Sequence, residues 1–137
     1  MTIKLEIVTA EQVVLIDEID QLNAPTKDGR VGILPKHTPL LTILDIGELD
    51  IIKGGERNAY AIAGGFMEVL PDRITILSDT VERADDIDEQ RAEEARVRAE
   101  EVLRQSDVSQ EDVIAAESEL RLALTRLRVS QLKRHSR

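Results

Sequence analysis

Residues 82–92 read ERADDIDEQRA, and the character of the sequence changes across them. Before this stretch, short runs alternate between apolar and polar residues, as β-strands do, and after it apolar residues recur every three or four positions, as in amphipathic helices. The stretch is dense in charge and begins a helix. We therefore predict a hinge between an N-terminal domain, residues 1–84, and a C-terminal domain, residues 85–137, that bury little surface against each other.

The N-terminal domain is predicted to be an antiparallel β-sandwich of about ten strands. Its apolar runs are short, are separated by Gly, Pro, Asn or Asp, and have no helix between them, which favours a sandwich or barrel. Proline and an Asp-Gly pair within residues 25–29 predict a tight hairpin turn. A break between two strands is expected near Gly47, and Gly64-Gly65 favours a bulge or bend over a phosphate-binding loop.

The C-terminal domain is predicted to be an antiparallel hairpin of two helices. The first begins at Asp86 or Asp88, either of which suits the N-cap and the helix dipole, and ends near Gln105. A connection of about four residues reverses the chain, and Ser109 with Asp112 resembles a capping box that opens the second helix. Alanines share one face of the first helix, and the main stripe of the second is expected at Leu120, Leu124 and Leu127.

Composition excludes several classes of function. A formal net charge of −9 and two aromatic residues, Tyr60 and Phe66, oppose nucleic-acid binding, which needs a basic face or stacking platforms. The absence of cysteine excludes disulfides and thiolate metal sites. No apolar run reaches the roughly 18 residues of a membrane span, and the first ten residues do not resemble a signal peptide, so we expect a soluble chain.

The distribution of charge is uneven. Residues 85–119 carry 13 acidic and 4 basic side chains, whereas residues 120–137 carry 6 basic and no acidic ones. Two interpretations stay open: the basic helix faces an acidic partner surface, or its cations lie favourably near the helix C-terminus. Catalysis is the weakest hypothesis, because His37 has no evident nucleophile beside it and no metal-ligand cluster is visible. We expect a structural or interface role for His37.

Several strings resemble, in order and spacing, the epsilon subunits of F-type ATP synthases of the bacterial type. They are GILPKHTPL at 32–40, AGGFMEV at 63–69, ITIL at 74–77, DIDEQRA at 86–92 and LRV at 127–129, and together the resemblance covers essentially the whole chain. It implies a β-sandwich followed by a helical hairpin, in a non-catalytic subunit of the rotor (the central stalk) that couples proton translocation to ATP synthesis. It also implies a peripheral location on the cytoplasmic face of the cell membrane, through the complex alone.

The resemblance implies particular partners and site residues. The sandwich would bind the gamma subunit and the c-ring, with Lys27, Asp28, Gly29 and Arg30 in the loop facing the c-ring and His37 at a subunit interface. The second helix would restrain ATP hydrolysis when the hairpin extends toward the beta and alpha subunits, through Arg121, Arg126, Arg128, Lys133 and Arg134.

A nucleotide motif of the family is matched at Ile87, Asp88, Arg91 and Ala92, with Arg126 from the second helix. One turn before Arg126, where strong binders have arginine, this chain has Leu122, and Arg121 points about 100° away around the helix. We therefore expect no required cofactor and at most weak regulatory ATP binding. The alternative function is a free-standing nucleotide-sensing or adaptor domain whose hairpin binds another partner.

Overall fold

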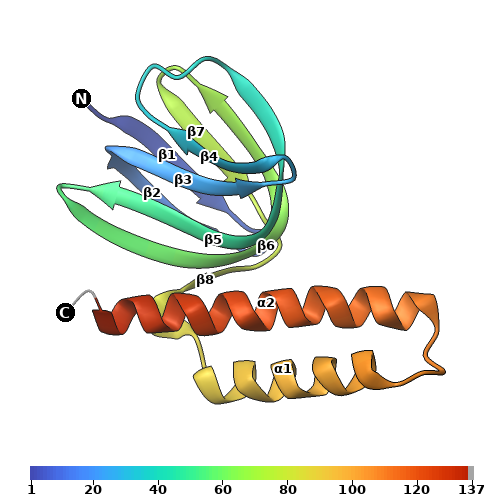
Figure 1. Cartoon of the computed structure of the whole chain (residues 1–137). Coiled ribbons are helices and arrows are strands. Elements are labelled where there is room, and N and C mark those ends of the chain that lie inside the picture. Colours follow the sequence, from blue (N-terminus) through green and yellow to red (C-terminus); the bar gives the residue numbers. More distant parts are fainter. Residues whose placement is uncertain (136–137) are drawn as a thin grey trace.

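The computed structural model describes residues 1–135, with side chains for residues 1–132, and shows a sheet domain followed by two long helices (Figure 1). The strands of the described part are β1 (Ile3–Val8), β2 (Val13–Ile19), β3 (Gln21–Thr26), β4 (Gly29–Ile33), β5 (Leu40–Lys53), β6 (Glu56–Leu70), β7 (Arg73–Leu77) and β8 (Val81–Arg83). A short 3-10 helix, η1 (Ala84–Asp86), leads to helices α1 (Glu89–Arg104) and α2 (Gln110–His135).

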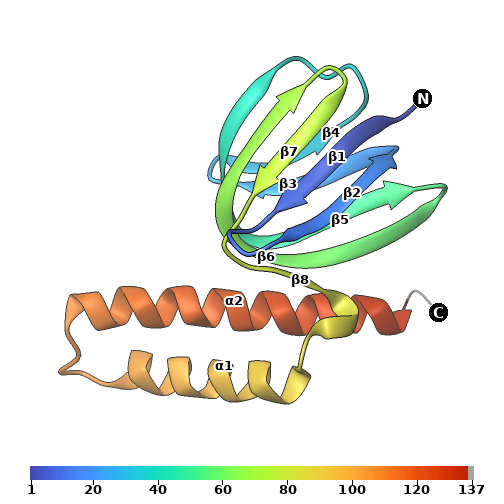
Figure 2. The same ribbon diagram turned by 180° about the vertical axis from the view of Figure 1, so that it is seen from behind.

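The strands are hydrogen-bonded in the order β2-β1-β7-β6-β5-β3-β4, and β8 pairs with β6. Strands β5 and β6, of 14 and 15 residues, curve strongly and belong to both layers of the sandwich (Figures 1 and 2). The predicted fold class is confirmed, with two differences. The described strands number eight instead of about ten, because β5 and β6 each continue where two strands were expected, and β1 pairs with β7 in parallel.

Glycines allow the long strands to bend without breaking. Gly47 stays paired with Ile62, so the expected break after Ile46 does not occur. Gly64 and Gly65 have φ angles of 82° and 121°, and beyond them β6 exchanges its neighbour β8 for β7. A Cβ atom on Gly65 would lie 2.1 Å from the carbonyl oxygen of Leu77. The predicted bend at this glycine pair is therefore confirmed.

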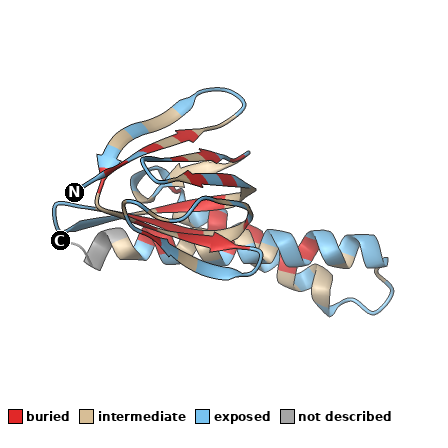
Figure 3. Cartoon of the chain, turned by 90° about the horizontal axis from the view of Figure 1, so that it is seen from above, coloured by how far each residue is buried: buried red, intermediate tan, exposed pale blue. Residues whose placement is uncertain are grey.

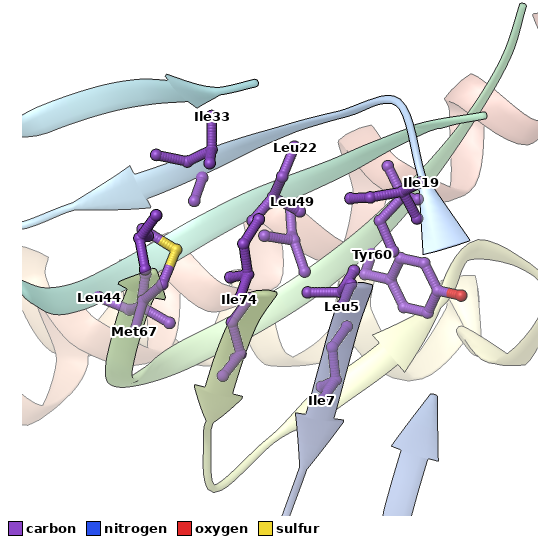
Figure 4. Packing of buried hydrophobic residues seen from close by; sticks show 14 of the residues in the cluster. Leu5, Ile7, Ile19, Leu22, Ile33, Leu44, Leu49, Tyr60, Met67 and Ile74 are labelled. Carbon is purple, nitrogen blue, oxygen red and sulfur yellow. The ribbon is translucent and has the colours of Figure 1, made fainter. Parts of the chain in front are cut away.

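The main core lies between the two layers and is aliphatic (Figure 4). Its fully buried side chains come from both layers and include Leu5, Ile7, Leu22, Ile33, Leu49, Met67 and Ile74. Alternating residues of each strand point into it, as the period of two predicts. No residue of α1, or of α2 as far as its side chains are described (to residue 132), belongs to this cluster, so the sandwich encloses its core without that part of the helices.

The helices form the predicted antiparallel hairpin. Helix α2 lies against β5 and β6, and α1 packs on α2 from the side away from the sheet (Figures 1 and 2). Asp88 is the N-cap of α1, since its Oδ1 accepts a hydrogen bond from the Arg91 amide at 3.1 Å, whereas Asp86 belongs to η1. The Ser109 hydroxyl accepts from the Asp112 amide at 3.1 Å, as the capping box predicts.

The predicted apolar stripe of α2 is wrong in part. Leu124 is 49% exposed and Leu120 and Leu127 are half-buried, whereas the buried positions are Ala116, Ala123, Val129 and Ser130 (Figure 3). Helix α2 packs against α1 on one side and the sheet on the other. Small residues on α2, with Ala92, Ala95 and Ala99 of α1, allow the backbones to approach closely. Among the described residues, no helix is long and apolar enough to cross a membrane.

Candidate functional site

The contact between α2 and the sandwich is built on one row of the sheet. Glu48 of β5 pairs with Ala61 of β6, and Ala61 pairs with Glu82 of β8. Residues paired across neighbouring strands point to the same face of a sheet. This row therefore presents a carboxylate, a methyl group and a second carboxylate side by side. Ala61 is fully buried in one cluster with Val129 of α2 and Ile87.

Three arginines of α2 pair with carboxylates of the sandwich. Arg128 Nε donates to Glu48 Oε1 at 2.9 Å, and Arg126 Nε donates to Glu82 Oε1 at 2.6 Å. One turn and a half earlier, Arg121 Nη2 donates to Asp45 Oδ2 at 2.8 Å. We call these three pairs, with Val129 over Ala61, the docking contact.

A charge cluster lies beneath the docking contact, formed by Glu48 and Asp50 with Arg30 and Arg57. Arg57 Nη2 lies 2.5 Å from Glu48 Oε2 and 3.0 Å from Asp50 Oδ2, and Arg30 Nη2 lies 2.9 Å from the same Asp50 oxygen. The side chains of Glu48 and Asp50 are 6% and 3% exposed. Buried carboxylates require such partners, because desolvation strongly disfavours an unpaired charge.

The two buried carboxylates differ in acidity. Burial and the neighbouring Glu48 carboxylate raise the pKa of Asp50 to about 6, against the lowering effect of Arg57. Burial also acts against ionised Glu48, yet hydrogen bonds from Asp50, Arg128 and Arg57 lower its pKa below the usual value. Asp50 Oδ1 is buried and has no hydrogen-bond partner among the residues that the structure describes. The arrangement suits one ionised carboxylate, Glu48, that receives α2, beside a second carboxylate that takes up a proton near neutrality.

The residues of the predicted nucleotide motif are divided among different roles. Ile87 and Ala92 are buried, in the cluster with Val129 and in the helix–helix contact. Asp88 caps α1, and Arg126 is paired with Glu82. The Arg91 side chain is exposed and forms no hydrogen bond or ion pair with a residue that the structure describes. Leu122 is half-buried on α2.

The predicted c-ring-facing loop forms the tip of the β3–β4 hairpin. Lys27, Asp28 and Gly29 are exposed, and Thr26 Oγ1 closes the turn by donating to the Gly29 carbonyl at 2.6 Å. Gly29 has a φ of 116°, which explains the Asp-Gly pair. Arg30 turns away from the tip, because its guanidinium donates to Asp50 and to the Glu48 carbonyl.

His37 lies in the loop between β4 and β5 and is half-buried. Its Nδ1 lies 2.6 Å from the Thr38 carbonyl oxygen, and its amide donates to the Leu34 carbonyl. The preceding residue, Lys36, has a φ of 66° and donates its amide to the Pro71 carbonyl, which ties this loop to the β6–β7 turn. The side chains of Lys133 and Arg134, predicted for the inhibitory helix, lie outside the described residues.

An exposed apolar surface runs across neighbouring strands of the sheet, on the side that faces away from the core. Ile43, Phe66 and Leu77 are cross-strand neighbours on β5, β6 and β7, and their exposed fractions are 45%, 54% and 51%. The row continues through Val8 of β1 to Val13 of β2. We define the apolar sheet face by its exposed large members: Val13, Ile16, Leu41, Ile43, Phe66 and Leu77.

Sequence reasoning missed both the apolar sheet face and the charge cluster. Apolar residues at 40, 41, 43 and 44 occupy both sides of one strand, a pattern that signals either full burial or a covered outer face. For the charge cluster, the available signal was the alternation of Glu48 and Asp50 with core residues Leu49 and Ile51. Carboxylates at those positions must point away from the core.

No group of three or more residues capable of holding a metal ion occurs among the described residues. The site offers carboxylates already paired with guanidinium groups, and surfaces suited to protein contacts.

Comparison with known proteins places this geometry in a family. The family model described as "ATP synthase, Delta/Epsilon chain, beta-sandwich domain" matches residues 2–84, and the one described as "ATP synthase, Delta/Epsilon chain, long alpha-helix domain" matches residues 85–131. The ATP synthase epsilon chain of Chloroflexus aggregans is 61% identical over 137 residues, with 100% of this chain and 98% of the relative covered. That of Herpetosiphon aurantiacus is 58% identical over 135 residues, covering 98% of each.

Solved structures share the fold at lower sequence identity. A chain of the Euglena gracilis mitochondrial ATP synthase superposes with a TM-score of 0.81 at 22% identity, over 90% of this chain and 78% of that one. A chain of the Tetrahymena thermophila mitochondrial ATP synthase, from a structure of its central stalk and c-ring, gives a TM-score of 0.70 at 14% identity, over 95% of this chain and 97% of that one.

Proposed function

The chain belongs to the ATP synthase delta/epsilon family, and from that premise we propose that it is a non-catalytic rotor subunit of the central stalk of an F-type ATP synthase. In this role it couples proton translocation to ATP synthesis and requires no cofactor of its own. It works at the cytoplasmic face of the cell membrane, and its attachment to the membrane runs through the complex.

The observation that carries the proposal is the apolar sheet face. Large exposed apolar patches on soluble proteins mark contact surfaces, because water-exposed hydrocarbon is unfavourable. Phe66, the sole phenylalanine of the sequence, lies at the centre of the row between Ile43 and Leu77. We assign this face to the gamma subunit, whose rotation the sandwich must follow without slipping. His37, in the loop that leads into Leu40 and Leu41, lies at the border of that interface.

The tip of the β3–β4 hairpin is assigned to the c-ring. Lys27, Asp28 and Gly29 are exposed there, on a turn that Thr26 holds in a fixed shape. Arg30, the fourth residue of the predicted loop, contributes from behind the tip by anchoring β4 to β5 through Asp50.

We assign the restraint of ATP hydrolysis to the helical hairpin that α1 and α2 form. Between residues 120 and 132, α2 carries three arginines and no acidic residue, so an extended helix offers a positive surface to the beta and alpha subunits. In the folded form described above, the docking contact holds these arginines against the sandwich.

ATP is proposed as a weak regulatory ligand at most. Arg91 is available near the start of α1, but Arg126 is already neutralised by Glu82 at 2.6 Å, and Leu122 supplies no charge one turn earlier. A phosphate group of ATP would have to displace the Glu82 carboxylate from Arg126, and this lowers the net free energy gained by binding ATP.

Two variants test the two assignments separately. Phe66→Ser should weaken binding to the gamma subunit at least tenfold in a pull-down or calorimetric titration. Leu124→Ser serves as the matched control, since Leu124 is comparably exposed but lies on α2. A chain ending at Asp86 should still bind gamma and should raise ATP hydrolysis by the reconstituted complex. Unchanged binding of the Phe66 variant would refute the gamma assignment, and loss of gamma binding in the shortened chain would refute the division of roles.

A further inference from the structure

In the docking contact, the arginines of α2 meet acidic residues of the sandwich on both sides of the helix. Arg121 and Arg128 are seven residues apart, about two helical turns, and therefore lie on the same side of α2. Both meet carboxylates of β5, Asp45 and Glu48. Arg126 lies about 200° around the helix from Arg128 and meets Glu82 of β8. Helix α2 thus lies over β6 with acidic residues of the sandwich on either side.

The apolar part of this contact is small. The cluster that joins α2 to the sandwich consists of Val129, Ala61 and Ile87, flanked by Ala59 and Ala84. One valine and its alanine neighbours remove little apolar area from water. Ion pairs therefore decide a large share of where α2 docks. The strength of an ion pair varies with exposure, and Arg126–Glu82 is the one pair of the three in which both side chains are less than a third exposed, at 28% and 27%.

An arginine of α2 that is held against the sandwich cannot at the same time reach a carboxylate on a partner subunit that the extended helix would contact. For the hairpin to leave, each guanidinium must give up its sheet partner, and it recovers comparable energy at an external carboxylate. Such an exchange is nearly balanced, so a small change in either acidic surface shifts the equilibrium between the two states.

We propose that Asp45, Glu48 and Glu82 form an internal competitor, an acidic surface of the sandwich that occupies the arginines of α2 and thereby sets how often the hairpin is free to act. The restraint that the freed hairpin exerts rests on the proposed function, whereas the docking equilibrium is a property of the chain itself.

The test compares the complete chain with a variant of the competitor. Asp45→Asn combined with Glu82→Gln removes two charges, and asparagine keeps the Oδ1 acceptor that Asp45 offers to the Ile46 amide at 2.8 Å. Glu48 is left intact, because it also holds Arg57 within the sheet. The matched control, Glu101→Gln with Glu117→Gln, removes the same charge from exposed positions of the hairpin without touching the sandwich.

Spin labels report the position of α2. The chain has no cysteine, so Glu56→Cys on β6 and Gln131→Cys on α2, both exposed, carry the labels without background. Pulsed electron paramagnetic resonance measures the distance between the two labels. The fraction of chains in which the labels lie far apart should rise roughly five- to thirtyfold in the competitor variant. It should stay at the parent level in the control. Equal distance distributions in the competitor variant and the control, with both chains folded by circular dichroism, would overturn the proposal.

The assembled enzyme separates this inference from the proposed function. In the reconstituted complex the competitor variant should restrain ATP hydrolysis more strongly than the control does. A shift in label distances without any change in hydrolysis would leave the internal competitor standing and refute the inhibitory role assigned to the hairpin.

Discussion

At the scale of single residues, the buried acid Asp50 is the group whose charge the structure disfavours, because it lies beside a second carboxylate, Glu48. The Asp50 side chain is 3% exposed and shares Arg57 with Glu48, and one of its carboxylate oxygens has no partner within the described part of the chain. A proton on Asp50 removes the repulsion between the two carboxylates and leaves the ionised Glu48 to receive Arg128. The raised pKa of Asp50 therefore supports the role of Glu48 in the docking contact.

This acid should leave a signature in the pH dependence of stability. The pKa of Asp50 rises from 3.8 to about 6 on folding, so the folded chain retains a proton that the unfolded chain has released. The associated stability is fully present below pH 3.8 and is lost as the pH rises through 6. Urea unfolding should give a free energy lower by roughly 1–1.5 kcal/mol at pH 7.5 than at pH 5 from this group.

Asp50→Asn should abolish that difference, since asparagine does not titrate. Asp17→Asn is the matched control, because Lys53 lowers the pKa of Asp17 and its titration falls below this window. An Asp50→Asn chain that keeps the full loss of stability between pH 5 and pH 7.5 would show that another group binds the proton.

Gly65 is a position where the fold leaves no room for a side chain. Its φ of 121° is strained for any side chain, and an added Cβ would collide with the Leu77 carbonyl at 2.1 Å and the Ser78 Cα at 2.8 Å. Gly65→Ala should lower the unfolding free energy by roughly 3 kcal/mol or more in urea titrations. Gly54→Ala tests the contribution of φ alone, since Gly54 has a φ of 58° and open space around it, and it should cost less than half as much.

Single residues also show what the sequence could and could not predict. The glycine bend at 64–65 and the Asp-Gly turn were predictable, because each requires a local backbone conformation that few residues adopt. The pairing of Arg126 with Glu82 spans 44 residues and that of Arg128 with Glu48 spans 80. Such pairs depend on the register of β5, β6 and β8 and on where α2 docks, which local patterns do not encode.

At the scale of elements, the residues that cap the helices were easier to predict from the sequence than the sides on which the helices are buried. The capping box at Ser109 and the hairpin followed from local chemistry. The buried face of α2 did not, because a helix packed on two sides buries small residues at the close contacts and leaves leucine at the margins. The predicted strand break near Gly47 is also absent. Here β5 bends and keeps its ladder of backbone hydrogen bonds with β6, which a turn would interrupt.

The start of α1 offers a direct test of its cap. Asp88→Ala removes the acceptor for the Arg91 amide, whereas Asp86→Ala, two residues earlier in η1, removes an equal charge without touching that bond. We expect Asp88→Ala to destabilise the first turn of α1 by about 1 kcal/mol, seen as faster hydrogen exchange at the Arg91 and Ala92 amides. Equal acceleration by both variants would mean that charge near the helix dipole, not capping, holds this turn.

At the scale of the whole molecule, the described residues form two apolar clusters of very different size. The sandwich encloses a large aliphatic core to which no described side chain of α1 or α2 contributes, and the second cluster joins Ala61, Ile87 and Val129 at the docking contact. A part that holds its own core can keep its structure while an appended part moves. This division fits the two proposed roles, a fixed link in a rotor and a mobile regulator.

The same division predicts that a chain ending at Asp86 folds by itself. It keeps all of β1 to β8 and the whole aliphatic core, and it loses the cover over Ala61 together with the arginine partners of Asp45, Glu48 and Glu82. Glu48 remains ionised and paired through Arg57, so no charge is left buried alone. We therefore expect a cooperative thermal transition, an unchanged β-sheet signal in circular dichroism, and a loss of about 1–3 kcal/mol in unfolding free energy. A shortened chain that binds a hydrophobic dye and melts without cooperativity would show that the sandwich needs α2 for its own packing, and the hairpin could then not leave it during function.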